Sequence, residues 1–325
     1  MRFASIAVLA IPAALAGPVM AQPVAEPAPA AAASTPAAAT PRPPTTKVRE
    51  EGLVADYFAA EPSQAKRGSV IVLGGSEGGL VSSRGIARQL AAQGFDAIAV
   101  SYFGEAGQPP RLDLIPIETV GRARAWLEAR PGHGGRIGVV GVSKGAELAL
   151  LVASRDPRIQ AVAVGVPSHV LWQGIDMTGG PTGSSWTAEG KPLAYVPYDL
   201  SQGFQGVHKL YVDSLKSAKP EAEIAVERIA GPVLMISDSS DRLWPSAEMA
   251  GKVEARLKAR GFRHPVVNLV YKDAGHMPFG PPVRRDASWL QQALFFGGTA
   301  DGVVAARADS WPRVVDFLAK ALAAE

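Results

Sequence analysis

The sequence contains no cysteine. This excludes disulfide bonds, thiolate metal sites, a cysteine nucleophile and a lipid anchor, although the chain remains compatible with an oxidising compartment. Clustered charge of one sign is also missing, because the formal net charge is only +3 and Lys and Arg are scattered. We therefore expect neither a nucleic-acid-binding surface nor a polybasic membrane patch. Apolar residues make up 47% of the 325 residues, which is enough for a sizeable core.

Residues 1–21 have the pattern of a secretory signal peptide. Arg2 precedes an apolar run at residues 3–20, and small residues precede a cleavage position after Ala21. An uncleaved membrane anchor is the alternative, but prolines interrupt the run and it is short for a spanning helix. We expect export to the periplasm or the outside of the cell, with no stable membrane insertion after cleavage.

Residues 22–46 consist almost wholly of Ala, Pro, Thr and Ser. Such a segment cannot bury enough apolar surface to offset its ordering entropy, so we predict a disordered or polyproline-like linker. The folded domain is expected at residues 47–325.

The folded part alternates short apolar runs with amphipathic segments. Apolar runs of this kind are typical of strands buried on both faces, and their alternation with helices indicates a mostly parallel sheet with helices on both faces. The pattern predicts strands at residues 69–73, 96–100, 136–140, 159–164, 232–237 and 265–271, and helices at 82–93, 117–129, 145–154, 247–260 and 310–324.

Residues 168–226 break this alternation and contain a Gly-rich stretch and several aromatic residues. A long irregular insertion after a sheet strand is typical of a cap over an active site, because structureless loops of this length are uncommon unless they have a function. The alternative is a surface excursion without function.

Residues 141–145 read GVSKG and match the G-x-S-x-G nucleophile elbow. The motif requires small neighbours because the serine lies on a sharp turn between a strand and a helix, which exposes its hydroxyl. Isolated matches arise by chance in Gly-rich chains. Here an apolar run precedes the motif and a small-residue helix follows it, so we predict that Ser143 is a nucleophile.

A serine hydroxyl needs a base to remove its proton, and a carboxylate to orient that base. His276 is the best candidate base, since it follows the sixth predicted strand in a Gly-flanked loop. The acid should follow the fifth strand, where Asp238 and Asp241 both occur. Asp238 lies nearer the strand and is suited to capping the turn. We therefore predict a triad of Ser143, Asp241 and His276, in the chain order that α/β-hydrolases use.

An oxyanion hole needs two backbone N–H donors. The residue after the nucleophile, Lys144, should supply one, and Ser76 or Glu77 in the Gly-rich turn after the first strand should supply the other. This turn has neither the spacing nor the lysine of a phosphate-binding loop, so no nucleotide is expected. No metal-ligand spacing occurs either, and we predict neither a metal nor a cofactor.

Five motifs in order resemble the C-terminal domain of the acyl-CoA thioester hydrolase and bile acid-CoA:amino acid N-acyltransferase family. They lie at residues 74–79, 141–147, 237–246, 275–276 and 296–299. The resemblance implies an α/β-hydrolase fold and a triad at Ser143, Asp241 and His276. Eukaryotic members of the family that this domain resembles carry an N-terminal β-sandwich domain. Residues 46–69 are too few to form such a domain.

The resemblance implies a serine hydrolase of acyl esters or thioesters. The amidating branch of the family resembles a cysteine enzyme, whereas this chain has a serine at that position. A serine ester passes its acyl group readily to water, so hydrolysis is favoured over transfer to an amino acid. The expected partner is a small acyl ester or thioester. Two alternatives remain open, namely a dienelactone-hydrolase-like or peptidase-like enzyme with the same triad, and a non-catalytic, envelope-associated binding protein.

Overall fold

The structure is a computed structural model that describes residues 45–50, 52–61, 68–131 and 135–323. The predicted signal peptide at residues 1–21 and most of the predicted linker, residues 22–44, lie outside the described residues. Within the described ranges, none of the helices combines the length and the apolar composition that crossing a bilayer requires.

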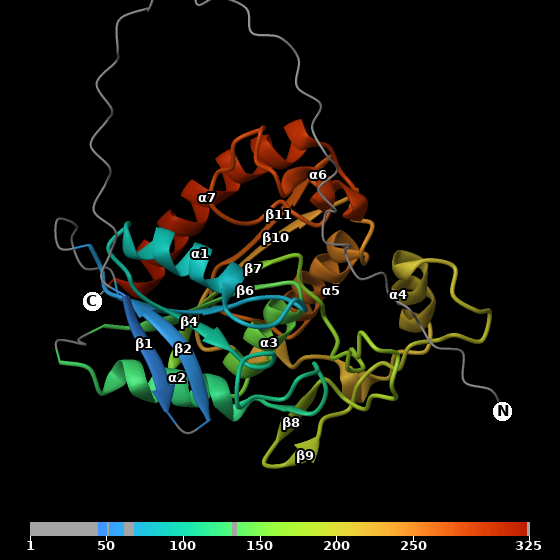
Figure 1. Ribbon diagram of the computed structural model, residues 1–325, viewed down its shortest axis with the longest axis horizontal. Coiled ribbons are helices and arrows are strands. Elements are labelled where there is room, and N and C mark those ends of the chain that lie inside the picture. The colour runs from blue at the N-terminus through green and yellow to red at the C-terminus, as the bar shows by residue number, and fades with distance from the viewer. Residues whose placement is uncertain (1–44, 51, 62–67, 132–134, 324–325) are drawn as a thin grey trace, which may run out of the picture.

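An eight-stranded sheet forms the centre of the protein (Figure 1). The strand order is β1-β2-β4-β3-β6-β7-β10-β11. The pairs β1–β2 and β2–β4 are antiparallel and all other neighbours are parallel, so the predicted mostly parallel sheet is confirmed. The strands are β1 (Thr45–Glu50), β2 (Leu53–Phe58), β3 (Ser69–Leu73), β4 (Asp96–Ser101), β6 (Ile137–Val142), β7 (Ile159–Gly165), β10 (Val233–Asp238) and β11 (Val266–Tyr271).

Helices cover both faces of the sheet, and each face has its own hydrophobic core. This arrangement is the expected α/β-hydrolase fold. On one face lie α1 (Val81–Ala91) and α7 (Ala300–Leu322), and on the other lie α2 (Glu118–Glu128), α3 (Lys144–Ala153) and α5 (Ser246–Ala259).

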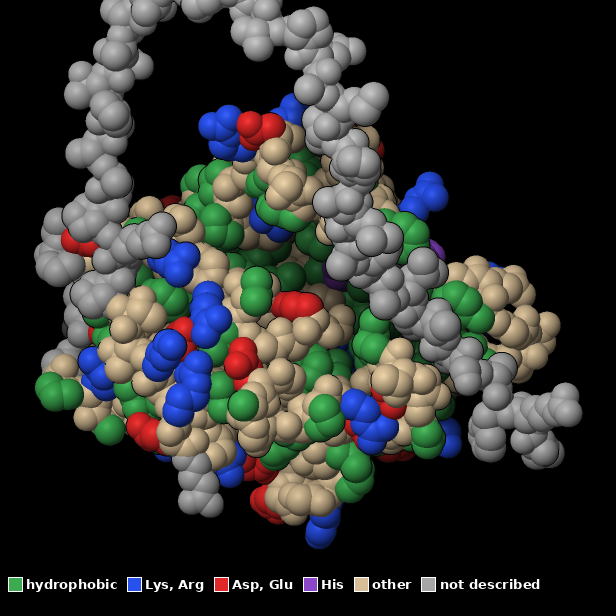
Figure 2. Space-filling model, viewed as in Figure 1, with side chains coloured by type: hydrophobic (Ala, Val, Ile, Leu, Met, Phe, Trp, Pro, Cys, Tyr) green, Lys and Arg blue, Asp and Glu red, His purple; other side chains and the backbone are tan. Residues whose placement is uncertain are grey.

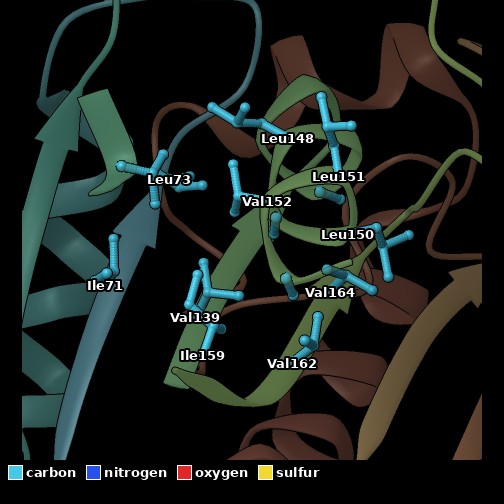
Figure 3. Packing of buried hydrophobic residues seen from close by; sticks show 14 of the residues in the cluster. Ile71, Leu73, Val139, Leu148, Leu150, Leu151, Val152, Ile159, Val162 and Val164 are labelled. Carbon is cyan, nitrogen blue, oxygen red and sulfur yellow. The ribbon is translucent and has the colours of Figure 1, made fainter. Parts of the chain in front are cut away.

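β3 illustrates why the strands read as unbroken apolar runs. Val70 and Val72 belong to the core that includes α1 and α7, whereas Ile71 and Leu73 face the opposite core. Figure 3 shows Ile71 and Leu73 beside the leucines of α3. Because successive side chains point to opposite faces, a strand covered on both sides needs an apolar residue at every position.

The first strand and the last helix of the folded domain differ from the prediction. β1 begins at Thr45, two residues inside the predicted linker, and the sequence pattern does not reveal it because Val48 is its only buried residue. α7 begins at Ala300, ten residues earlier than expected, with Thr299 accepting a hydrogen bond from the Gly302 N–H. Pro312 lies inside this long helix, although proline is more common in the first turn of a helix.

The predicted insertion at residues 168–226 packs a small hydrophobic cluster that Trp244 and Met249 complete, and its Leu171 and Trp186 join the main core. Its strand β8 (Trp186–Ala188) pairs with β5 (Ile115–Pro116) in a three-stranded sheet. The remaining short elements of this region are β9 (Lys191–Pro192), α4 (Val207–Leu215), η1 (Pro220–Ala222) and η2 (Val226–Arg228), and near the C-terminus lie α6 (Leu290–Ala293) and η3 (Leu294–Phe296). The role of the insertion as a cap stays a prediction.

Candidate active site

Ser143 lies on the turn between β6 and α3, with a positive φ of 56°. A non-glycine residue in this region is strained, and the surrounding structure must hold it there. The flanking glycines make the turn feasible. A Cβ at Gly141 would lie 2.1 Å from the Gly145 carbonyl oxygen, and a Cβ at Gly145 would lie 2.1 Å from that of Gly74. The elbow predicted from the sequence is therefore present, for the steric reason given.

The structure brings Ser143, His276 and Asp241 together. His276 Nε2 lies 3.0 Å from Ser143 Oγ, and His276 Nδ1 lies 2.8 Å from Asp241 Oδ2. All three residues are buried, with 7%, 5% and 5% of their surfaces exposed respectively. The arrangement is a hydrogen-bonded relay from carboxylate to imidazole to hydroxyl, and its catalytic role stays a prediction.

The hydrogen bonds define the tautomer of His276. A carboxylate can only accept, so the Nδ1–H group donates to Asp241. In the neutral ring, Nε2 then carries the lone pair and accepts the hydroxyl proton of Ser143. The imidazole is thus oriented to remove a proton from Ser143.

Further donors fix Asp241. Its Oδ1 accepts from the Leu243 N–H at 2.9 Å, and its Oδ2 accepts from the Ser246 hydroxyl at 2.6 Å. Trp244 is fully buried, and its ring centroid lies 5.9 Å from that of His276. The carboxylate therefore has little freedom to turn away from the imidazole.

One carbonyl joins the loops that carry the acid and the base. The Phe296 carbonyl oxygen accepts hydrogen bonds from the N–H groups of Arg242, at 3.0 Å, and His276, at 3.2 Å. Gly297 follows, where a Cβ would lie 2.1 Å from the Ser240 carbonyl oxygen. Sequence reasoning assigned Phe296 no role, although its Gly-Gly neighbours signal close backbone approach.

The turn after β3 lies against the nucleophile, since a Cβ at Gly75 would be 3.4 Å from Ser143 Cβ. Tyr102 holds this turn by donating its hydroxyl to the carbonyl oxygens of Gly74 and Gly75, at 2.7 and 2.9 Å. Burial raises the pKa of Tyr102 well above its usual value, so it remains a donor. Sequence reasoning missed Tyr102, whose only signal is its position directly after a buried strand.

The three N–H groups predicted for the oxyanion hole are those of Lys144, Ser76 and Glu77. Within the described ranges, none of them has a protein acceptor. The Glu77 carboxylate accepts a hydrogen bond from the Gly75 N–H at 3.0 Å, so the N–H group of Gly75 already has an acceptor. The three predicted donors are therefore free to bind an oxyanion, and their assignment stays a prediction.

The side chain of Lys144 is buried and forms an ion pair with Glu147 on the next turn of α3, at 2.5 Å. Burial raises the pKa of Glu147 and lowers that of Lys144, and in each case the charge of the other opposes the shift. Sequence reasoning gave Glu147 no role. Across the described part of the chain, no group of three or more metal-ligating side chains could hold an ion.

Figure 2 shows a hollow with largely hydrophobic walls on the face below α7. A histidine side chain lies beside it and an acidic side chain lies at its lower edge. This face therefore offers an apolar recess next to ionisable groups.

Comparisons with known proteins identify the family and support the fold. Residues 115–324 match the family model described as the C-terminal domain of BAAT and acyl-CoA thioester hydrolases. The chain is 28% identical to acyl-coenzyme A thioesterase 6 of Mus musculus over 289 residues, covering 85% of this chain and 65% of the mouse protein. It is 29% identical to acyl-coenzyme A thioesterase 1 of Rattus norvegicus, covering 84% and 64% of the two chains. The match thus spans just under two thirds of the length of these relatives.

Solved structures support the fold alone, because their identities are low. A puromycin-hydrolyzing peptidase of Mycobacterium tuberculosis matches with a TM-score of 0.54 and 17% identity, over 87% of this chain and 40% of the peptidase. A dienelactone hydrolase of Klebsiella pneumoniae matches with a TM-score of 0.52 and 17% identity, over 82% and 93% of the two chains. With an α/β-hydrolase fold and a family match across most of its folded part, the chain belongs to the BAAT and acyl-CoA thioester hydrolase C-terminal family.

Proposed function

We propose that this protein is a serine hydrolase that cleaves an acyl ester or thioester through an acyl-enzyme on Ser143. The observation that carries the proposal is the 3.0 Å contact between His276 Nε2 and Ser143 Oγ, with Asp241 behind the imidazole. A nucleophile, its base and the group that orients the base occur together in this arrangement.

The proposed reaction has two halves. As Ser143 Oγ bonds to the acyl carbon, His276 Nε2 takes the hydroxyl proton and then delivers it to the departing thiolate or alkoxide. In the second half His276 takes a proton from water, the hydroxide adds to the acyl carbon, and the carboxylic acid leaves as Ser143 regains its proton. Lys144 and one of Ser76 and Glu77 donate their N–H groups to the oxyanion in both halves. The chemistry requires no cofactor.

The substrate class follows from the relatives, which are named as acyl-coenzyme A thioesterases. We propose a small acyl thioester or ester of this type. Hydrolysis is preferred over transfer to an amino acid because an oxygen ester at Ser143 passes its acyl group readily to water.

The N-terminal sequence adds a proposal on location. Residues 1–21 have the composition of a cleaved signal peptide, so we propose that the mature enzyme acts in the periplasm or outside the cell. Mass spectrometry of the mature protein should give an N-terminus at Gln22. An intact Met1 on protein recovered with the membrane would contradict the proposal.

The decisive variant is Ser143→Ala. We expect kcat for p-nitrophenyl and acyl-CoA esters to fall by about 10⁴-fold or more, since triad members act as a unit. A fluorophosphonate probe should label the wild-type protein at Ser143 and leave the variant unlabelled. Unchanged turnover in the variant would exclude Ser143 as the nucleophile. No adduct on the folded wild-type protein would favour the non-catalytic binding protein. A panel of thioesters, lactones and peptide amides then tests the substrate class.

A further inference from the structure

The insertion at residues 168–226 is attached to the helix that follows the nucleophile through one carboxylate. Glu147 Oε1 accepts hydrogen bonds from the Trp172 N–H at 3.0 Å and from the Trp186 Nε1–H at 2.6 Å. Glu147 is completely buried, as are both tryptophans. Both donors belong to the insertion, whereas the acceptor belongs to α3, so this contact joins two separate parts of the fold.

Lys144 completes the junction. Its Nζ contacts Glu147 Oε2 at 2.5 Å and donates to the Ser185 hydroxyl at 2.9 Å. The Ser185 hydroxyl in turn donates to the Gln173 carbonyl oxygen at 3.0 Å. The residue whose backbone N–H is expected to bind the oxyanion is thus held by its side chain against the insertion.

From this junction the insertion reaches the other parts of the site by ring contacts. The ring centroids of Trp186 and Tyr102 lie 5.5 Å apart, and Tyr102 holds the turn that carries the second predicted oxyanion donor. On the other side, contacts run from Trp172 to Tyr211 at 4.8 Å and from Tyr211 to Trp244 at 5.4 Å, and Trp244 packs on His276.

We propose that Glu147 is a positioning residue that sets the oxyanion donors and the base through the insertion. The inference rests on the proposed function. Without the carboxylate, two buried donors of the insertion lose their acceptor, and such groups move toward other acceptors or water. Any shift of Trp172 or Trp186 then reaches the site through the contacts described, where small displacements strongly affect catalysis.

The test compares four single variants and one double variant by kcat per active site, with sites counted by fluorophosphonate titration of folded protein. For Glu147→Ala we expect kcat to fall at least about tenfold while KM changes much less. Glu147→Gln keeps an acceptor oxygen for the two tryptophan donors but places an uncharged NH2 group against Lys144 Nζ, so kcat should be at least about threefold higher than in Glu147→Ala while remaining below that of wild type. Trp186→Phe removes one donor and should lower kcat about threefold alone, but add little to Glu147→Ala, because the two act on one contact.

Glu227→Ala is the matched control, since Glu227 is a half-buried carboxylate whose ion pair with Arg256, at 2.7 Å, includes no residue of the triad. It should lower the free energy of unfolding and leave kcat per site unchanged. Glu147→Ala with wild-type kcat per site would overturn the inference and leave a purely structural ion pair. An equal decrease in kcat per site in Glu147→Gln and Glu147→Ala would also overturn the inference. Failure of the serine mechanism itself would appear separately, as retained turnover in Ser143→Ala.

Discussion

Asp238 is the last residue of β10 and Asp241 lies three positions further on, in the loop that follows, and their carboxylates contact different elements. Asp238 accepts from the Ser240 N–H at 2.7 Å and the Ala274 N–H at 2.9 Å, so it fastens the turn after β10 to the loop before the base. Asp241 faces the ring of His276 at 2.8 Å. The two carboxylates therefore make different contacts, and the role of Asp241 as the orienting acid stays a prediction.

Replacing each aspartate by asparagine should separate these roles. Asp241→Asn should lower kcat by about 10⁴-fold with little loss of stability, since the amide favours the wrong imidazole tautomer. Asp238→Asn should lower the free energy of unfolding by about 1–2 kcal/mol and kcat by less than about tenfold. Steady-state kinetics and urea unfolding of both variants provide the measurement. The reverse ranking in kcat would assign the orienting acid to Asp238.

Tyr102→Phe tests whether the turn after β3 forms the oxyanion hole. The variant loses the hydroxyl that binds the carbonyl oxygens of Gly74 and Gly75. We expect kcat to fall about tenfold with KM nearly unchanged, because oxyanion donors act mainly in the transition state. Tyr271→Phe is the control, since its hydroxyl contacts Asp309 instead. Equal kcat in both variants would show that the turn needs no support from Tyr102.

Two glycine substitutions should change stability in opposite directions. In Gly145→Ala the new Cβ would meet the Gly74 carbonyl oxygen, so we expect a loss of at least about 2 kcal/mol and of most activity. In Gly121→Ala, within α2, nothing lies within 4 Å of the new Cβ. That variant should gain about 0.5–1 kcal/mol from helix propensity and keep full activity. Thermal unfolding and esterase assays check both, and a stable, active Gly145→Ala would refute the close approach.

Acid should destabilise the fold through His169. Burial lowers its pKa to about 4, and Nδ1 has no hydrogen-bond partner among the described residues. Between pH 6.5, the ordinary pKa of histidine, and pH 4, the unfolded chain binds a proton at His169 that the folded chain does not. The free energy of unfolding therefore falls as the pH falls through this range. The contribution is about 2 kcal/mol between pH 7.5 and pH 5.

Urea unfolding at these two pH values should show a smaller difference in His169→Gln than in the wild-type protein. His264→Gln is the control, because His264 is exposed, and it should retain the full pH dependence. An unchanged pH dependence in His169→Gln would mean that other groups cause the loss of stability in acid.

The predictable features are those that a local pattern determines. The run at residues 69–73 must be apolar at each position because both faces of β3 are covered. The elbow at Ser143 needs glycine at fixed distances from the serine, so the sequence alone marks the turn. His276 and Asp241 follow strands in the order that the fold requires, which places them at one edge of the sheet.

The remaining features depend on contacts between distant segments, which leave no local pattern. The Gly-Gly pair after Phe296 signals a close backbone approach, but it does not identify Arg242 and His276 as the residues whose N–H groups bind the Phe296 carbonyl. Likewise, Glu147 resembles an ordinary residue of the first helical turn, and only the insertion 25 residues later explains its burial. β1 could not be predicted, because a strand with one buried residue shows no alternation of apolar and polar side chains.

The left-handed backbone at Ser143 has a consequence for engineering. Glycine adopts this conformation without strain, so folding alone would favour glycine at the position where chemistry demands serine. A library of variants sorted only by resistance to heat should therefore enrich for inactive proteins at this codon. Useful thermostable variants would need selection for turnover at the same time.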